Sequence, residues 1–243
     1  LPRHGRGHRT PPTSVNSRAN IWALKTLGVR WILSVSAVGS LREHIHPLDV
    51  VVPDQLVDHT RHRHLTFFDN PGLVVHVGMG NPFSKNLSAI AADAAETAGG
   101  TVHRGGTYLC IEGPQFSSQG ESELYRSWGM DIIGMTAIPE ARLAREAEIC
   151  YAILAMVTDY DVWHESEQDV SAELVIENLA RNTLLSQETV RRAVPKIAAV
   201  GSECECATAL ETAIVTAPDA VDRALVDRYQ LLVGQYLGQS SDK

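Results

Sequence analysis

Two aspartates that follow an apolar run are the residues best suited to chemistry in this sequence. Asp159 and Asp161 come after Tyr151–Val157, whose composition is that of a buried strand. Ligands bind where buried strands leave an open α/β sheet, so these carboxylates are expected to face a polar ligand. A solvated acidic turn is the usual role of such a pair, but the apolar run before it and Trp163 after it disfavour that role here.

A second segment offers groups for an aromatic base. The extended run Thr107–Ile111 is ended by Glu112-Gly-Pro114, which places Phe116 at the strand's exit, where its ring can stack on a base. Ser118-Gln-Gly-Glu121 has the pattern of a capping box and predicts the start of a helix. Further on, Gly134-Met-Thr136 offers a thioether and a hydroxyl, although a lone methionine is more often core packing. These residue types suit a sugar and a purine.

Two segments could bind an anion. Arg3-His-Gly-Arg-Gly-His8 combines arginine, whose fork suits phosphate, with glycine, which lets the backbone approach a ligand closely. By composition alone, a flexible basic terminus is the favoured interpretation of this segment. Ser36-Ala-Val-Gly-Ser40 directly follows a predicted buried strand, so its hydroxyl and amides can face an anion, although plain strand-to-turn connections are common.

In chain order, these segments resemble the methylthioadenosine phosphorylases, a branch of the trimeric purine nucleoside phosphorylases. The resemblance runs from Leu1 to about Val200. Any one motif could occur by chance, but together they are highly specific. The motifs are Leu1-Pro-Arg-His-Gly-Arg-Gly-His8, Asn20-Ile-Trp-Ala-Leu24, Ala37-Val-Gly-Ser-Leu-Arg-Glu43, Asp54-Gln55, Glu112-Gly-Pro114, Met135-Thr136 and Thr158-Asp-Tyr-Asp-Val-Trp163.

The resemblance implies a fold, a reaction and an assembly. The fold is a three-layer α/β/α phosphorylase fold with a mixed central sheet, and the assembly is a homotrimer. The reaction is phosphorolysis of 5′-methylthioadenosine to adenine and 5-methylthioribose 1-phosphate, in purine and methionine salvage, with inorganic phosphate as co-substrate and no metal or organic cofactor. Three alternatives stay open: a phosphorylase for methylthioinosine, adenosine or a 6-oxopurine nucleoside; an inactive purine-binding subunit; and a hydrolase that uses water.

The resemblance also implies roles for single residues. Phosphate is bound by Arg3, His4, Ser36, the backbone amide of Ala37, and Thr136; His8 lies near the ribose 5′ substituent, and Met135 covers the ribose. In that family a first strand and a Gly-rich turn also bind phosphate. No equivalent segment precedes Arg3 here, so the sequence is expected to be an N-terminally incomplete member.

Asp159 is the residue expected to select the base. Its carboxyl can accept from the N6 amine of adenine and, when protonated, donate to N7, whereas an amide would suit a 6-oxopurine. Asp161 lies on the same side if the backbone stays extended, and there it could hold the amine or a bridging water. Ala172, Val175 and Ile176 share one apolar helix face that resembles the family's 5′ pocket and suits a methylthio group, but core packing is an equally fair interpretation.

Composition limits the other possibilities. The net charge of −8 argues against nucleic acid as a partner, which leaves a nucleoside and phosphate as small-molecule partners. The longest apolar runs have strand length rather than membrane-span length, and the basic first residues lack the apolar core of a signal peptide, so a cytoplasmic location is predicted. No repeat or Gly/Ser linker divides the chain, so residues 1–243 are expected to form a single domain.

The cysteines and a histidine-rich segment are given structural roles. Cys110 and Cys150 lie in apolar runs and are expected to be buried free thiols. Cys204 and Cys206 are expected to be two thiols near a helix start, with a redox-labile bridge as the minority alternative. A final cluster, His59, His62 and His64 with Arg61 and Arg63, lacks the spacing of a zinc site and is expected to be a solvated loop.

The elements that must position these residues alternate between helices and buried strands, as in α/β proteins. Helices are predicted over Ser14–Leu27, Leu87–Ala98, Pro139–Glu148, Ser171–Ala199 with a break at Pro195, and Asp219–Leu237; strands over Trp31–Val35, Asp49–Val52, Leu73–Val77, Thr107–Ile111, Met130–Ile133 and Cys150–Val157; and a loop over Asp54–Phe68.

Overall fold

The computed structural model describes residues 1–164, 172–201 and 204–238, and the side chains of 172–176 and 205 lie outside that description. The strands are β1 (Trp31–Ser40), β2 (Val50–Val52), β3 (Gln55–His59), β4 (Val102–Arg104), β5 (Thr107–Ile111), β6 (Ile132–Gly134) and β7 (Cys150–Asp159). The helices are α1 (Ser17–Thr26), α2 (Lys85–Thr97), α3 (Gln119–Ser127), α4 (Ala137–Glu146), α5 (Ala172–Val200), α6 (Arg223–Arg228) and α7 (Gln230–Leu237).

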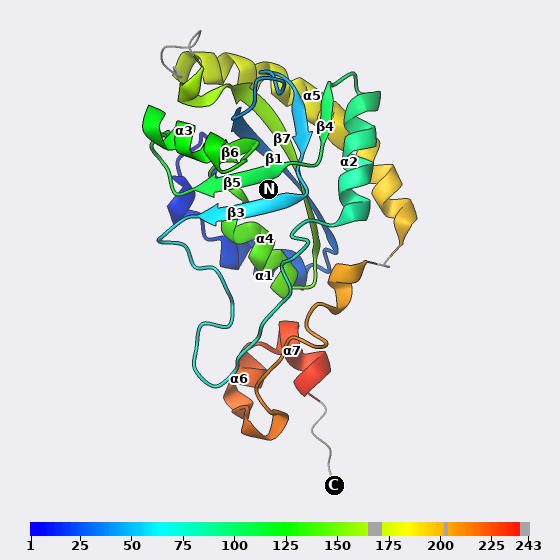
Figure 1. The fold of residues 1–243 in the computed structure, drawn as a ribbon. Coiled ribbons are helices and arrows are strands. Elements are labelled where there is room, and N and C mark those ends of the chain that lie inside the picture. Colours follow the sequence, from blue (N-terminus) through cyan, green and yellow to red (C-terminus); the bar gives the residue numbers. More distant parts are fainter. Residues whose placement is uncertain (165–171, 202–203, 239–243) are drawn as a thin grey trace.

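Within the described residues, one seven-stranded sheet runs in the order β3-β5-β6-β1-β7-β2-β4 (Figure 1). Neighbours are parallel except β6 with β1 and β7 with β2, which are antiparallel. Helices α2 and α5 pack together and against β7, while α1 packs on α4, which also contacts β7. The predicted α/β fold with a mixed central sheet between helical layers is confirmed.

Strand β7 is the centre of the hydrophobic core. All of its residues are buried, because helices cover both faces of the sheet here. Alternate side chains belong to different clusters: Tyr151, Ile153 and Val157 join one, while Leu154 and Met156 join the cluster beside α2. This two-sided burial explains the continuous apolar run in the sequence, and it fixes the position of the aspartates at its end.

Two short strands lie where none was predicted. Gln55–His59 forms β3 inside the predicted loop Asp54–Phe68, and Val102–Arg104 forms β4 at the opposite edge of the sheet. Both are edge strands with mixed polar and apolar residues, so their sequence lacks the apolar run of a central strand. Their pairing comes from backbone hydrogen bonds to β5 and β2, a contact that the local sequence does not indicate.

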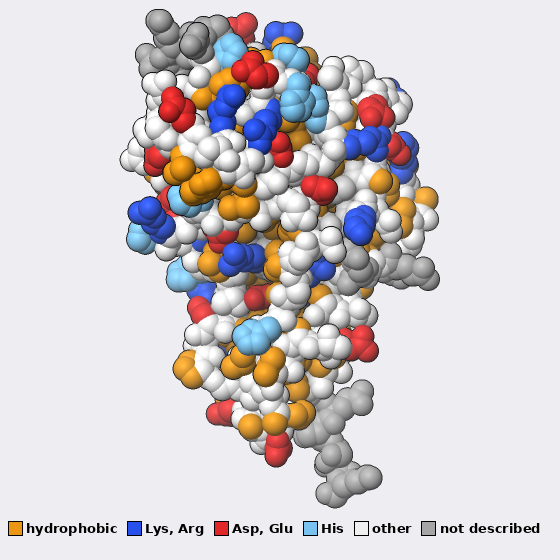
Figure 2. Space-filling view, in the orientation of Figure 1, with side chains coloured by type: hydrophobic (Ala, Val, Ile, Leu, Met, Phe, Trp, Pro, Cys, Tyr) orange, Lys and Arg blue, Asp and Glu red, His pale blue; other side chains and the backbone are white. Residues whose placement is uncertain are grey.

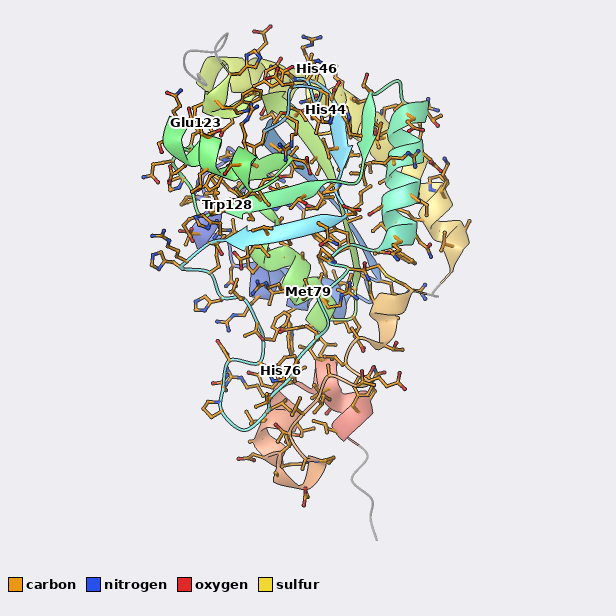
Figure 3. All side chains as sticks on the ribbon, viewed as in Figure 1. His44, His46, His76, Met79, Glu123 and Trp128 are labelled. Atoms are coloured by element: carbon orange, nitrogen blue, oxygen red, sulfur yellow. A yellow bond between two sulfur atoms is a disulfide. The ribbon has the colours of Figure 1, made fainter. Side chains whose placement is uncertain are left out.

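The predicted strand Leu73–Val77 is wrong as a member of the sheet. This segment forms only an isolated bridge between Val75 and Ile214, and its backbone bonds go to residues 213–216. Figure 3 shows His76 on this segment, beside the C-terminal helices, and Met79 just beyond the segment, nearer the sheet. The β-branched residues therefore cover the C-terminal part of the chain instead of extending the sheet.

Two helix predictions also need correction. Helix α5 continues through Pro195 to Val200, so the predicted break is absent. The single helix predicted over Asp219–Leu237 is two helices: Asp222 caps the start of α6, and Tyr229, with φ −105° and ψ 20°, separates α6 from α7. The capping box of Ser118 and Glu121 is confirmed, with both of its reciprocal bonds present.

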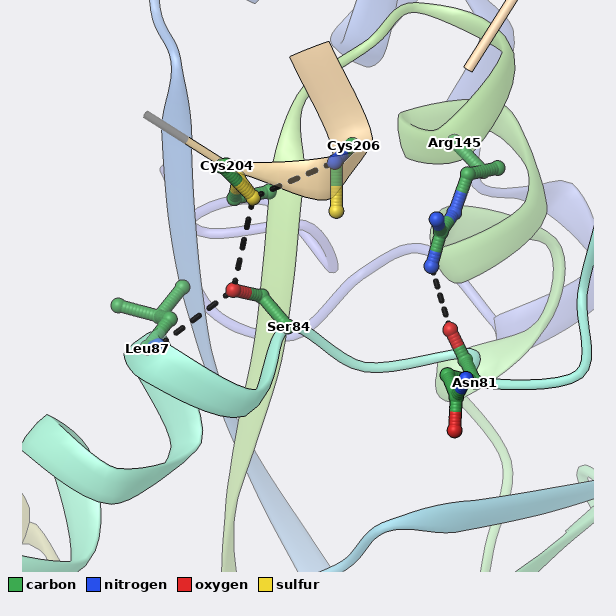
Figure 4. The surroundings of a disulfide bond; sticks show 7 residues. Asn81, Ser84, Leu87, Arg145, Cys204 and Cys206 are labelled. Atoms are coloured by element: carbon green, nitrogen blue, oxygen red, sulfur yellow. Dashed lines mark hydrogen bonds between the residues drawn. A yellow bond between two sulfur atoms is a disulfide. The ribbon is translucent and has the colours of Figure 1, made fainter. Parts of the chain in front are cut away.

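The expectation that Cys150 is a free thiol is wrong. Cys150 and Cys204 form a disulfide that links the start of β7 to the segment 54 residues later (Figure 4). Cys110 and Cys206 are buried and stay as thiols, so the considered bridge between Cys204 and Cys206 is not formed. Cys204 reaches Cys150 because the chain returns to the sheet after α5, which is a tertiary contact that the spacing of the cysteines does not reveal.

Charged side chains of both signs lie on the face drawn in Figure 2. On the face in Figure 2, acidic and basic side chains are interspersed rather than separated into patches. Among the described helices, none combines the length and the hydropathy that crossing a membrane requires.

Candidate active site

A cavity of about 610 Å³ lies where β1, β6 and β7 meet, and it is lined by residues that come from distant parts of the sequence. Most of the predicted site residues line it: Arg3, His4, His8, Ser36, Ala37, Phe116, Met135, Thr136, Asp159 and Asp161. Lining residues to which the sequence interpretation gave no individual role are Arg9, Pro11, Pro12, Val35, Val38, Gly39, Ile111, Pro114, Ser117, Ile133, Thr158 and Leu179.

Strand pairing brings these residues together. Segment Ser36–Ser40 is not a turn after a strand, as predicted, but the second half of β1, which has a register irregularity between Val38 and Gly39. The parallel pairing with β7 aligns Gly39 with Asp159. The antiparallel pairing with β6 turns the following residues back beside β1, so that the hydroxyls of Ser36 and Thr136 lie 2.9 Å apart.

The two aspartates have different environments. Asp159 accepts hydrogen bonds from the Asp161 backbone N–H at 2.8 Å and from the Thr158 hydroxyl at 2.6 Å, and both bonds favour a carboxylate. The sequence interpretation expected an extended backbone at Asp161, but the backbone there is left-handed, with φ 55°. The side chains of both aspartates still line the cavity.

Asp161 is the carboxyl whose environment favours a proton. It is only 4% exposed, and the polar contacts that oppose protonation, from the Ser122 hydroxyl and the Val162 backbone N–H, do not outweigh its burial. Burial, together with the charge of Asp159, raises the pKa of Asp161 to about 6. A buried carboxyl that can hold a proton near neutral pH, beside one that accepts two hydrogen bonds, is an arrangement suited to donating to one ligand atom while accepting from another.

Arg3 lines the cavity, but the protein already occupies most of its donors. The guanidinium donates to both carboxylate oxygens of Glu140 at 2.6 and 2.9 Å, to the Ser34 hydroxyl at 2.5 Å and to the Val35 carbonyl at 3.1 Å. Burial alone would lower the pKa of Arg3, but the hydrogen bonds and charge of Glu140 outweigh it and raise that pKa. Glu140 therefore neutralises much of the charge that Arg3 could offer an anion.

Glu140 and Ser34 were not predicted as part of this site. An acidic residue in the first turn of α4 is ordinarily explained by the helix dipole, so the sequence contains no separate signal for Glu140. Tyr151 also donates to Glu140, at 2.9 Å, which helps to fix the position of this carboxylate.

His4 and His8 lie together at the cavity wall, with their rings stacked at 4.3 Å between centroids. Burial lowers the pKa of His4, and its Nδ1 lies 2.8 Å from the Thr10 carbonyl oxygen. A carbonyl can only accept, so Nδ1 carries the hydrogen, and in the neutral ring Nε2 is left as an acceptor. Neutral His4 can therefore accept from a protonated phosphate oxygen.

The histidine-rich segment after β3 is a loop, as expected, in which Arg61, His62 and His64 are exposed, and it also binds Glu112 of the motif Glu112-Gly-Pro114. Glu112 accepts from the backbone N–H groups of Arg61 and His62 and from the side chains of Thr13 and Arg63. Although burial opposes the change, these bonds lower the pKa of Glu112 to about 2. His59 ends β3 and packs against the rings of Tyr125 and Trp128; Trp128 is labelled in Figure 3.

Arg63 links this loop to the backbone around Glu112 and Met135. Its side chain is only 3% exposed, and it donates to the carbonyl oxygens of Glu112, Met135 and Ile138 at 2.7–2.9 Å. Charge-assisted bonds of this kind position the backbone around Met135. The sequence contains no signal for this role, because an arginine in a basic stretch is usually exposed.

Helix α5 stabilises the end of β7 beside the cavity. Asn178 and Asn182, one turn apart and both buried, donate to the carbonyl oxygens of Thr158 and Val157 at 2.6 and 2.8 Å. They hold the end of β7 where its regular pairing stops. The predicted 5′-pocket residues Ala172, Val175 and Ile176 lie on the first turns of the same helix, but their side chains lie outside the described residues.

Comparison with known proteins gives consistent results. Residues 1–195 match the model of the phosphorylase superfamily. The S-methyl-5′-thioadenosine phosphorylase of Geobacter sulfurreducens is 52% identical, over 98% of this chain and 82% of that protein.

Solved structures agree with the sequence comparison. A methylthioadenosine phosphorylase from an Antarctic soil metagenomic library superposes with a TM-score of 0.90 at 50% identity, covering 96% of this chain and 82% of the other. A mutant of the adenosine/methylthioadenosine phosphorylase of Schistosoma mansoni, in complex with methylthioadenosine, superposes with a TM-score of 0.77 at 38% identity, covering 82% and 75% of the two chains.

Proposed function

Because this chain belongs to the phosphorylase superfamily, among the S-methyl-5′-thioadenosine phosphorylases, we propose that its cavity is the active site in which 5′-methylthioadenosine reacts with inorganic phosphate. The products are adenine and 5-methylthioribose 1-phosphate. The observation that carries this assignment is the meeting of a carboxyl pair, Asp159 and Asp161, with a hydroxyl pair, Ser36 and Thr136, around one cavity.

The carboxyl pair is assigned to the base. As the glycosidic bond breaks, N7 of the purine gains electron density and needs a proton or a strong donor. The raised pKa of Asp161, about 6, supports it as the donor, and the two hydrogen bonds that Asp159 accepts support it as the carboxylate that receives the N6 amine. The sequence interpretation gave Asp159 both the N6 amine and the N7 proton; this division moves the N7 proton to Asp161 and leaves Asp159 with the N6 amine.

The opposite side of the cavity is assigned to phosphate and ribose. The hydroxyls of Ser36 and Thr136 can donate to phosphate oxygens, neutral His4 can accept from a protonated one, and the remaining N–H of Arg3 adds a weaker contact because Glu140 balances its charge. The backbone amide of Ala37 is a further candidate donor. Phe116, half exposed at the cavity's edge, is proposed to stack on the base, and Met135 and His8 to border the ribose.

The same proposal covers the features that concern the whole protein. We take inorganic phosphate as the co-substrate, with no metal or organic cofactor, and we infer a homotrimer in the cytoplasm. Leu124 and Trp128, which are 46% and 47% exposed near α3, are apolar surface that subunit contact could bury. Light scattering at several concentrations measures the assembly, and a mass of one chain would contradict it.

Dependence on phosphate tests the reaction class. Adenine release from 5′-methylthioadenosine should require phosphate and should yield a sugar 1-phosphate detectable by phosphorus NMR. Equal release in a phosphate-free buffer would instead support the hydrolase. The absence of release in both buffers, with adenine still bound, would support the inactive purine-binding subunit.

A further inference from the structure

The hydroxyl of Tyr108 is a buried polar group that the proposed reaction does not yet use. Tyr108 lies on β5 and is fully buried, yet it does not line the cavity. Its hydroxyl lies 3.3 Å from the Ser36 hydroxyl, which in turn lies 2.9 Å from that of Thr136. Three hydroxyls from β5, β1 and the start of α4 thus form a continuous chain that ends at the cavity.

Gly134 makes room for this arrangement. In the register of β5 and β6, Tyr108 pairs with Ile132 and Cys110 with Gly134. The Tyr108 ring reaches diagonally across β6, so that its hydroxyl lies beside Gly134. A Cβ atom at position 134 would overlap the Tyr108 hydroxyl and lie only 2.8 Å from the ring carbon Cζ. A side chain at 134 and the tyrosine hydroxyl therefore exclude each other, and in this chain the tyrosine occupies the space.

The direction of its hydrogen bond suggests what the Tyr108 hydroxyl does. Burial raises the pKa of Tyr108 to about 12, so the phenol keeps its proton at working pH. A buried O–H needs an acceptor; the Ser36 oxygen lies 3.3 Å away, and the Thr136 side chain also interacts with the phenol. When Ser36 accepts from Tyr108, its own proton can go to Thr136 at 2.9 Å, to the cavity, or to the Ala37 carbonyl at 3.4 Å, and the longer distance makes the carbonyl the weaker acceptor. Without Tyr108, Ser36 can accept from Thr136 instead, which leaves the Ala37 carbonyl as the protein acceptor for its proton.

We propose that Tyr108 is a positioning residue that, through Ser36, directs the Ser36 and Thr136 hydroxyls toward phosphate. This inference rests on the proposed function, because it assumes that phosphate occupies that side of the cavity. Tyr108 itself touches neither substrate. Its effect should therefore appear in the use of phosphate and not in the binding of the nucleoside.

Tyr108→Phe tests the proposal, since it removes one oxygen atom and keeps the ring. The KM for phosphate should rise about 3- to 10-fold, the size expected for one lost hydrogen bond, while the KM for 5′-methylthioadenosine changes less than about 2-fold. Tyr236→Phe is the matched control, because its hydroxyl donates to Glu148 on the other side of the protein. That control should leave both KM values unchanged.

A double-mutant cycle with Ser36→Ala separates positioning from a general structural effect. If Tyr108 acts through Ser36, Tyr108→Phe should change the phosphate KM less than about 2-fold in the Ser36→Ala background. An equal effect in both backgrounds would overturn the proposal, as would an unchanged phosphate KM in folded Tyr108→Phe. Tyr108→Met also lacks the hydroxyl and gives the same expectation if the phenylalanine variant does not fold.

The two levels of inference can fail separately. If the wild-type protein releases adenine without phosphate, the proposed function fails. If the wild-type protein requires phosphate and Tyr108→Phe has the wild-type phosphate KM, only the role of Tyr108 fails.

Discussion

Replacing Asp161 with asparagine should change activity and stability in opposite directions. The pKa of Asp161 is raised from 3.8 to about 6 by burial, so the folded protein holds this proton more tightly than the unfolded chain. Stability contributed by the protonated form is therefore lost as pH rises from about 4 to about 6, and above pH 6 the buried carboxylate carries its full cost. This change in the pKa of Asp161 corresponds to an upper bound of about 3 kcal/mol.

Asparagine removes this cost and fits the backbone. It tolerates the left-handed conformation that Asp161 adopts at φ 55°, and its volume is nearly that of aspartate. The free energy of unfolding of Asp161→Asn at pH 7.5 should therefore exceed the wild-type value by about 1–3 kcal/mol. Because the amide cannot transfer a proton to N7, kcat/KM for 5′-methylthioadenosine should fall about 10- to 100-fold.

The pH dependence provides an independent check. The ratio of kcat/KM in the wild type to that in Asp161→Asn should decrease as pH rises from about 5.5 to 8, because only the wild type loses a proton; phosphate ionisation affects both proteins and cancels. Asp159→Asn is the matched control, and it should lose both activity and stability because Asp159 accepts two hydrogen bonds. A constant ratio, or an Asp161→Asn protein with unchanged activity and stability, would refute the reasoning.

Three further expectations follow from the site and the disulfide. First, kcat/KM should be higher for 5′-methylthioadenosine than for inosine, since Asp159 accepts from an N6 amine. Faster cleavage of inosine would contradict the base assignment. Second, Glu140→Gln should lower the free energy of unfolding by about 2 kcal/mol, because it disrupts a mostly buried ion pair. The same change should lower the KM for phosphate about 3-fold, because the charge of Arg3 is no longer balanced. An unchanged KM for phosphate would show that Arg3 does not act on phosphate. Alkylation of unreduced, denatured protein should label only Cys110 and Cys206, and reduction should lower stability by roughly 4 kcal/mol for a 54-residue loop; four labelled cysteines would show that the bond between Cys150 and Cys204 is absent.

Local sequence determined the central elements of this protein. The apolar run of β7 had to be a buried strand because so many consecutive apolar residues need cover on both faces, and Ser118 and Glu121 had to begin a helix because their side chains satisfy free N–H groups. Motifs of residue type at fixed order were enough to indicate the family and the reaction. These features depend on neighbours in the chain, so the sequence carries them directly.

Tertiary structure alone decided what each site residue touches. The bonds of Arg3 to Glu140, the donors from Asn178 and Asn182, and the approach of Tyr108 to Ser36 join residues 20 to 137 positions apart. The same holds for the disulfide of Cys150 and for the edge strand β3, whose partners come from distant segments. Burial and charge around Asp161 are likewise set by packing, so its proton affinity could not be predicted from its neighbours in sequence: the pKa of a carboxyl depends on what surrounds it in space.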